Sequence, residues 1–207
     1  MKKKIIALML TGLFLVGCGK QVKKDEPKQT EQKTEKKEEK KEETSKEEKT
    51  TEENGMKKTI VFTNKELNKK GKAGSINYNF SKIQVSKLIA TTDTAAKMLQ
   101  IEKGKEFTVV AIDVEAENTE DKDVNFFISQ AKLISNTKEQ LEPNMLTSKH
   151  IDGEFLGKVK KDGTNVYLLK NTKAEDLKSI EIRLNAPIDK NFNKLSEDIK
   201  LTIELKK

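Results

Sequence analysis

The chain has 207 residues, of which 36% are charged and 34% are apolar, and its formal net charge is +7. The chain has a single Cys, so it contains no disulfide within itself. With only one Cys and one His, it also has too few of the preferred ligands for a zinc site. Arg183 is the only Arg and Trp is absent, so the Arg forks and aromatic platforms typical of nucleic-acid readers are missing. The composition therefore argues against a disulfide scaffold, a zinc enzyme and a nucleic-acid-binding protein.

Residues 1–17 have the three parts of a secretory signal peptide: a Lys-rich start, an apolar run and a small residue, Gly17. The apolar run is too short to span a bilayer. The stretch Leu15-Val16-Gly17-Cys18 resembles the bacterial lipobox, in which the Cys thiol receives a diacylglycerol before the signal peptide is removed. We therefore predict that Cys18 is lipidated and anchors the chain to the extracytoplasmic face of the cell membrane. The alternative is that Cys18 is an ordinary thiol of the signal segment.

Residues 18–56 are predicted to be a disordered tether that separates the lipid from the rest of the chain. Residues 19–55 contain eleven Lys and twelve Asp or Glu, with no aromatic residue. Such a segment buries too little apolar surface to offset its chain entropy. Over residues 36–43 every pair four positions apart has like charges, which disfavours a helix.

Residues 57–207 have the pattern of one globular domain. Apolar and polar residues alternate with a period of two, which is typical of half-buried strands. Strands are predicted at Thr59–Thr63, Ile76–Phe80, Val110–Ala116, Val124–Ile128, Ala131–Ser135, Asn165–Lys170, Ile180–Leu184 and Ile199–Leu205. The predicted fold class is all-β, an immunoglobulin-like antiparallel β-sandwich of about seven to nine strands.

Three short segments between the predicted strands have sequences typical of a helix or a turn. Ala95–Ile101 is expected to form one or two helical turns, and the run Thr172–Glu175 resembles a capping box that opens a short turn. The pair Asp162-Gly163 suits a tight hairpin turn, because both positions tolerate a positive φ.

The long run Phe107–Thr119, with Phe126-Phe127, Leu133 and Val166–Leu169 after it, carries a family resemblance. It is similar to the telokin-like, immunoglobulin-fold domain of unknown function found in many lipoproteins of Gram-positive bacteria. In that family a long strand of alternating apolar residues ends in an Asn and a polar turn, and Glu117-Asn118-Thr119 matches this end. The resemblance implies an immunoglobulin-like fold and brings no catalytic residues.

No catalytic site or cofactor is predicted. His150 lies in Ser148-Lys149-His150-Ile151-Asp152, which contains the residue types of a hydrolase triad. Triad members come from separate segments, so we interpret His150 as a solvated loop residue. The acidic turn at Asp121 and Asp123 begins like a calcium loop but lacks the Gly and Glu of an EF-hand. A looser calcium site that uses Glu117, Asp121 and Asp123 remains an alternative to an ordinary solvated turn.

The expected function is a non-catalytic one. The lipid on Cys18 would hold the chain to the membrane, and the domain would contact an extracellular protein or another cell-envelope partner. Phe127 or Phe126, adjacent on one strand, and the loop residue Phe155 are the aromatic candidates for such a contact. The alternative functions are an atypical cell-surface hydrolase and a carrier of a small ligand in an apolar cavity.

Overall fold

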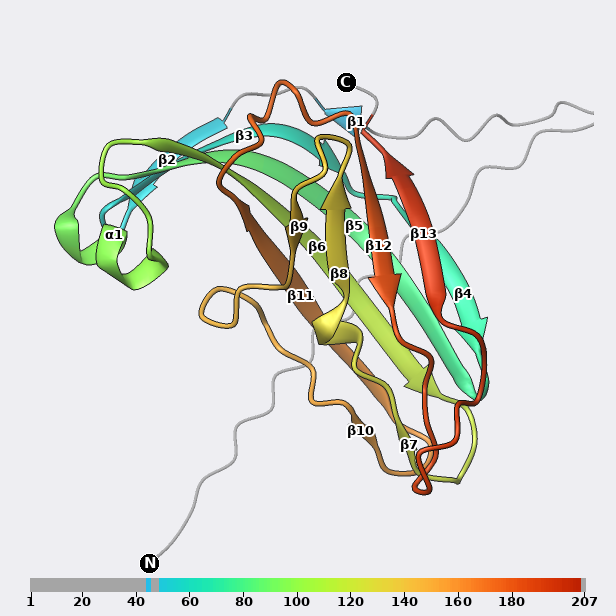
Figure 1. Cartoon of the computed structure of the whole chain (residues 1–207). Helices are drawn as coiled ribbons and strands as arrows, with labels where there is room; N and C mark the ends of the chain where they lie inside the picture. Colours follow the sequence, from blue (N-terminus) through green and yellow to red (C-terminus); the bar gives the residue numbers. More distant parts are fainter. Residues whose placement is uncertain (1–43, 46–48, 206–207) are drawn as a thin grey trace, which may run out of the picture. The chain divides into compact units, whose positions relative to one another are not determined.

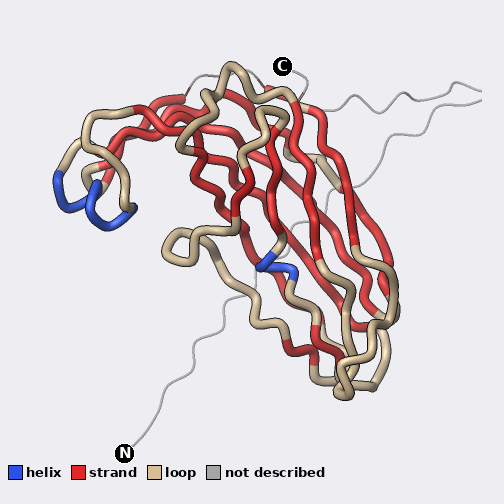
Figure 2. The backbone as a smooth tube through the Cα atoms, in the orientation of Figure 1, coloured by secondary structure: helices blue, strands red, loops and turns tan. Residues whose placement is uncertain are grey.

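The structure, a computed structural model, describes residues 44–45 and 49–205. Within these residues the fold is mostly β, with antiparallel sheets and one short α-helix (Figures 1 and 2). None of the described residues form a helix long and apolar enough to cross a membrane. Cys18 and the predicted signal peptide lie outside the described residues, as does most of the predicted tether.

Seven strands form the first sheet, in the order β1-β3-β5-β6-β11, with β2 paired to β3 and β4 paired to β5. Its strands are β1 (Thr44–Ser45), β2 (Lys49–Glu53), β3 (Met56–Asn64), β4 (Lys69–Ala73), β5 (Ile76–Ala90), β6 (Glu106–Asn118) and β11 (Lys160–Leu169).

The second sheet has four strands in the order β13-β12-β8-β9, and a third, two-stranded sheet pairs β10 with β7. These strands are β7 (Val124–Asn125), β8 (Lys132–Ser135), β9 (Gln140–Leu141), β10 (Glu154–Phe155), β12 (Ser179–Leu184) and β13 (Ile199–Glu204). The described part contains thirteen strands, more than the seven to nine expected. The strands that the sequence did not predict are β1, β9 and β10, which have only two residues each, and the polar strands β2 and β4, which lack an apolar alternation. The strand predicted at Val124–Ile128 is shorter than expected, since β7 ends at Asn125 and a 3-10 helix forms at Ile128–Gln130.

The hydrophobic core lies between the two larger sheets. Ile112 on β6 and Tyr167 on β11 belong to the same buried cluster as Leu133 on β8 and Ile182 on β12. Successive residues along a strand face opposite sides of the sheet, so every second residue lies on the same face, and one face of each sheet supplies this cluster. The predicted strand alternation is therefore confirmed for the long strands, and Figure 1 shows β8, β12 and β13 lying across them.

The register of β6 supplies a direct test of this core. Val114 is 1% exposed, whereas its neighbour Glu115 reaches the surface and forms an ion pair with Lys160 at 3.0 Å. Val114→Ala is expected to lower the free energy of unfolding by about 1–3 kcal/mol, because it removes buried methyl groups and leaves a cavity. Glu115→Ala should change it by no more than about 0.5 kcal/mol. Urea denaturation of both variants measures the difference, and a larger cost for Glu115→Ala would contradict the register.

The short helix α1 (Asp93–Leu99) confirms the helical prediction and begins two residues earlier than expected. The hydroxyl of Thr92 accepts a hydrogen bond from the backbone N–H of Ala95 at 3.3 Å, which caps the first turn. Gln100 ends the helix in the left-handed conformation, with φ of 53°. The short turn predicted after Thr172 also forms, with the Asp176 N–H donating to the Lys173 carbonyl at 3.0 Å, and the Thr172 hydroxyl donates to Glu139 at 2.8 Å.

Two further expectations are corrected. Residues 49–56 were expected in the tether, but β2 pairs with β3 through a turn at Asn54-Gly55, where both φ angles are positive. All five residues of β2 are exposed, and an edge strand of this kind needs no apolar residues. Its polar sequence therefore gave no strand pattern from which β2 could be predicted. Gly163 was expected in a hairpin turn, yet it lies inside β11, opposite Val114 of β6. Gly163 is required there for space, since an added Cβ would lie 2.4 Å from the Lys149 carbonyl oxygen.

Candidate functional site

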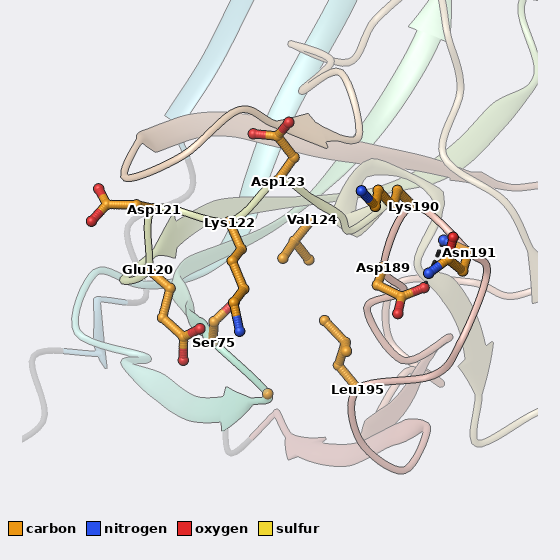
Figure 3. A pocket seen from close by; sticks show the side chains of 11 residues that line it. Ser75, Glu120, Asp121, Lys122, Asp123, Val124, Asp189, Lys190, Asn191 and Leu195 are labelled. Atoms are coloured by element: carbon orange, nitrogen blue, oxygen red, sulfur yellow. Dashed lines mark hydrogen bonds between the residues drawn. The ribbon is translucent and has the colours of Figure 1, made fainter.

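A cleft of about 630 Å³ opens where three loop segments meet beyond the ends of the strands (Figure 3). Its walls come from the β4–β5 turn at Gly74-Ser75, the loop over residues 119–123 between β6 and β7, and the segment over 188–195 between β12 and β13. These segments are far apart in the sequence, so only the fold brings them together. Because loops on a rigid sheet scaffold commonly carry binding residues, this cleft is the candidate site.

Asn118, the last residue of β6, positions one wall of the cleft. Its side chain is 1% exposed, and its amide Nδ2 donates to the carbonyl oxygens of Lys122 at 2.7 Å and Gly157 at 2.9 Å. Its Oδ1 accepts a hydrogen bond from the backbone N–H of Glu120 at 3.3 Å. One buried amide therefore closes the 119–123 loop on itself and ties it to the segment that follows β10.

Asp189 organises the opposite wall. Its Oδ1 accepts hydrogen bonds from the backbone N–H groups of Asn191 at 2.8 Å and Asn193 at 2.9 Å, and its Oδ2 accepts one from the Asn193 amide at 3.0 Å. The hydrogen bond from the Asn193 side chain is the main cause that lowers the pKa of Asp189, and the backbone donors add to it. The carboxylate thus stabilises the turn as an anion.

The two walls are joined by backbone pairing. Asn125 and Ile188 exchange N–H···O hydrogen bonds, both of 2.9 Å, and the N–H of Thr119 donates to the Ser75 carbonyl at 3.0 Å. The cleft is therefore held by backbone bonds on two sides, and its polar groups are preorganised by the loops that carry them.

The charged residues that line the cleft are of both signs, with more acidic than basic side chains. Glu120, Asp121, Asp123 and Asp189 are its acidic residues, and Lys122 and Lys190 are its basic ones. In Figure 3 the carboxylates of Asp121 and Asp123 point in different directions at the rim of the cleft. This mixture of charges suits the recognition of a polar surface that offers both donors and acceptors.

The looser calcium site that the sequence left open does not assemble. Asp121 pairs with Lys158 at 3.1 Å, and Asp123 accepts a hydrogen bond from the Gly157 N–H at 3.0 Å. Glu117 lies within β6, opposite Lys160 in the neighbouring strand. Among residues 44–45 and 49–205, no group of three or more acidic, His or Cys side chains is arranged to hold a metal ion.

The structure also separates the residue types of a triad around His150. His150 is exposed, and the Ser148 hydroxyl accepts a hydrogen bond from the Val166 N–H at 3.0 Å. Asp152 forms an ion pair with Lys161, and the hydrogen bond from Lys161 is the main cause that lowers its pKa. Each of these side chains is engaged with a different part of β11 or faces solvent.

The aromatic candidates divide between core and surface. Phe126 and Phe155 are fully buried, while Phe127 is 39% exposed. Of the three candidates for a partner contact, the structure therefore exposes Phe127 alone, while Phe126 and Phe155 belong to the core. The sequence did not point to the 188–195 wall of the cleft, although its run Asp189-Lys190-Asn191-Phe192-Asn193 carries the residue types of a hydrogen-bonded turn.

The comparison with curated proteins finds one lipoprotein relative. The chain is 31% identical over 114 residues to the SPbeta prophage-derived uncharacterized lipoprotein YonS of Bacillus subtilis. The match covers 54% of this chain and 56% of that protein, so it spans little more than half the length of the relative. No family model matches the chain.

Solved structures supply a likeness in fold alone. A functionally unknown protein from Listeria monocytogenes matches with a TM-score of 0.56 at 14% identity, over 72% of this chain and 88% of that one. A conserved hypothetical protein from Bacillus anthracis matches with a TM-score of 0.33 at 12% identity, over 76% of this chain and 96% of that one, which is too low to support an argument.

Proposed function

We propose that this protein is a lipid-anchored, non-catalytic binding protein of the extracytoplasmic face of the cell membrane. Cys18 carries the lipid, the charged segment after it links the lipid to the domain, and the domain contacts a protein or cell-envelope partner. The observation that carries the proposal is the lipobox at residues 15–18 in a chain that is similar to a lipoprotein of Bacillus subtilis.

The arrangement of the sheets supports the finer assignment of an immunoglobulin-like β-sandwich. The two larger sheets are antiparallel and share one hydrophobic cluster, and β6 ends in the buried Asn118 at the position expected from the telokin-like family. Domains of this architecture commonly bind through the loops at one end of the sandwich. The cleft between the 119–123 and 188–195 loops is such a surface.

Lipidation of Cys18 is tested by Cys18→Ser. Because the thioether-linked acyl chains supply the membrane affinity, this variant should lose incorporation of a clickable fatty acid and move from the membrane fraction to the soluble fraction. Labelling of intact cells and fractionation measure both changes. Undiminished label in the variant would disprove the anchor at Cys18.

The contact surface is tested by photo-crosslinking on intact cells. A photoreactive residue in place of Lys190, at the cleft, should capture a defined partner, whereas one in place of the exposed Lys69 on β4 should not. Asp189→Ala removes the carboxylate that closes the turn and should abolish the product at position 190. Equal capture from both positions would contradict the use of the cleft.

A further inference from the structure

A second recess lies on the face of the first sheet that is turned away from the core. Its inner part, of about 200 Å³, has side chains of β5, β6 and β11 on its floor, among them Leu88, Val109 and Leu168. Its outer part, of about 290 Å³, extends between α1 and the loop over residues 144–146. Leu99, Asn144 and Leu168 line both parts, so the two are continuous, and we call them the apolar groove.

Exposed apolar side chains lie close together at the rim of the apolar groove. Six large apolar residues are exposed in the described part of the chain, and three of them line the outer part of the groove. These are Met98 at 49%, Met145 at 65% and Leu146 at 70% exposure. Exposed apolar residues that gather at one place mark binding sites more often than scattered ones, and Met side chains adapt to ligands of different shape.

One charged side chain lies inside the apolar groove. Lys58 is the only charged residue that lines the inner part, and it is half-buried. Burial lowers the pKa of Lys58, and the nearby Lys82 lowers it further. Lys82 itself has a counter-ion, Asp113 at 3.7 Å, whereas Lys58 forms no ion pair or hydrogen bond with any described residue. A half-buried ammonium without a partner costs free energy that an anionic ligand would recover.

The charges of the outer part do not compensate Lys58. Glu142 lines the outer part, but its carboxylate pairs with Lys132 at 3.4 Å. Lys170, also in the outer part, donates to the Gln100 carbonyl at 3.2 Å. The groove therefore combines an apolar floor with a positive charge at its inner end that has no counter-ion among residues 44–45 and 49–205.

We propose that the apolar groove binds a single-chain fatty acid, with the alkyl chain on the floor formed by β5, β6 and β11 and the carboxylate at Lys58. An apolar body with one negative end complements the lining in both respects. The inner part is too small for a helix, whose diameter with side chains is about 10–12 Å. This site is distinct from the cleft and goes beyond the partner contact proposed above.

Calorimetric titration tests the site with defined probes. The protein used is the whole mature chain, residues 18–207 with Cys18→Ser, so that no acyl chain of its own competes. Decanoate, below its micelle concentration, should bind with a stoichiometry of one. Decanol should bind about tenfold more weakly, and decyltrimethylammonium should not bind measurably. Equal binding of all three would show adsorption to apolar surface and would overturn the proposal.

Two variants locate the ligand. Lys58→Met keeps the apolar stem and removes the charge, so decanoate should bind about tenfold more weakly while decanol binds unchanged. The control Lys57→Met alters an exposed Lys on the opposite face of the same strand and should change neither affinity. Met145→Glu, at an exposed rim position, should weaken decanoate binding about tenfold. Circular dichroism should show that all three variants are folded and that none unfolds at a lower temperature than the parent chain.

Another occupant would give a different result. If a second copy of the chain covered the groove, sedimentation would show a concentration-dependent dimer that Met145→Glu abolishes, and decanoate would not bind. That outcome would overturn the fatty-acid site, as would unchanged decanoate binding in Lys58→Met.

Discussion

Asn118→Asp is expected to destabilise the domain by about 3–5 kcal/mol at pH 7, as for a buried charge without a partner. The amide Nδ2 of Asn118 donates to two carbonyl oxygens, those of Lys122 and Gly157. A carboxylate of the same shape would place negative charge against both acceptors at a position that is 1% exposed. The substitution therefore removes two donors and adds an uncompensated charge, although it barely changes the volume.

The cost of Asn118→Asp should depend on pH in a defined direction. Burial against the carbonyl oxygens of Lys122 and Gly157 raises the pKa of the introduced carboxyl above the value of about 3.9 for an unfolded chain, and outweighs the single long hydrogen bond from the Glu120 N–H. The folded variant therefore binds the proton more tightly, and its deficit should be smaller at pH 4.5 than at pH 7. Urea denaturation at both pH values measures this change. The control Asn185→Asp, at an exposed position, should cost no more than about 0.5 kcal/mol, and an equal cost for the two variants would contradict the role of Asn118.

Gly163→Asn is expected to cost about 3 kcal/mol or more, at the upper end of the range for overpacked sites. An added Cβ would lie 2.4 Å from the Lys149 carbonyl oxygen and 2.8 Å from Cγ1 of Ile151. The same carbonyl accepts a hydrogen bond from the Thr164 N–H at 3.0 Å, so it cannot withdraw without breaking that bond. The substitution therefore separates the 149–151 segment from β11.

Asn at this position distinguishes the two interpretations of Asp162-Gly163. A hairpin turn would accept Asn, which tolerates a positive φ, whereas a crowded strand position would not. The control is Gly104→Asn, because Gly104 has φ of 78° and an added Cβ there meets no atom within 4 Å. Thermal unfolding should show a much smaller loss for Gly104→Asn. A tolerated Asn at position 163 would contradict the close approach of Lys149.

Much of the fold was predictable because a strand that is buried on one face has alternating apolar and polar residues in its sequence. Ile112 and Val114 alternate with Asp113 and Glu115, and the structure buries the first two. The helix at Asp93–Leu99 was also predictable, since its capping and apolar residues lie within a few positions of one another. The burial of Phe126 and the exposure of Phe127 were not determined in this way, because both residues lie between the end of β7 and the 3-10 helix at Ile128–Gln130.

The prediction that Cys18 is lipidated rests on the sequence alone, because a lipobox is a continuous motif next to a signal peptide and needs no fold to be recognised. The candidate cleft and the apolar groove are different, since each is built from segments far apart in the chain. The two walls that Asn118 and Asp189 organise are joined by the backbone bonds between residues 125 and 188. Lys58 comes to lie beside the apolar floor of β6 and β11, with no counter-ion in the described part of the chain, only because of the tertiary structure.

The strands, the short helix and the lipidation motif were thus determined by local periodicity and local chemistry. The position of Gly163 and the polar strand β2 were decided by the tertiary structure, because close approach and edge pairing depend on neighbours that are distant in sequence. The same dependence governs both recesses, where the fold determines which side chains meet and which charges remain without a partner.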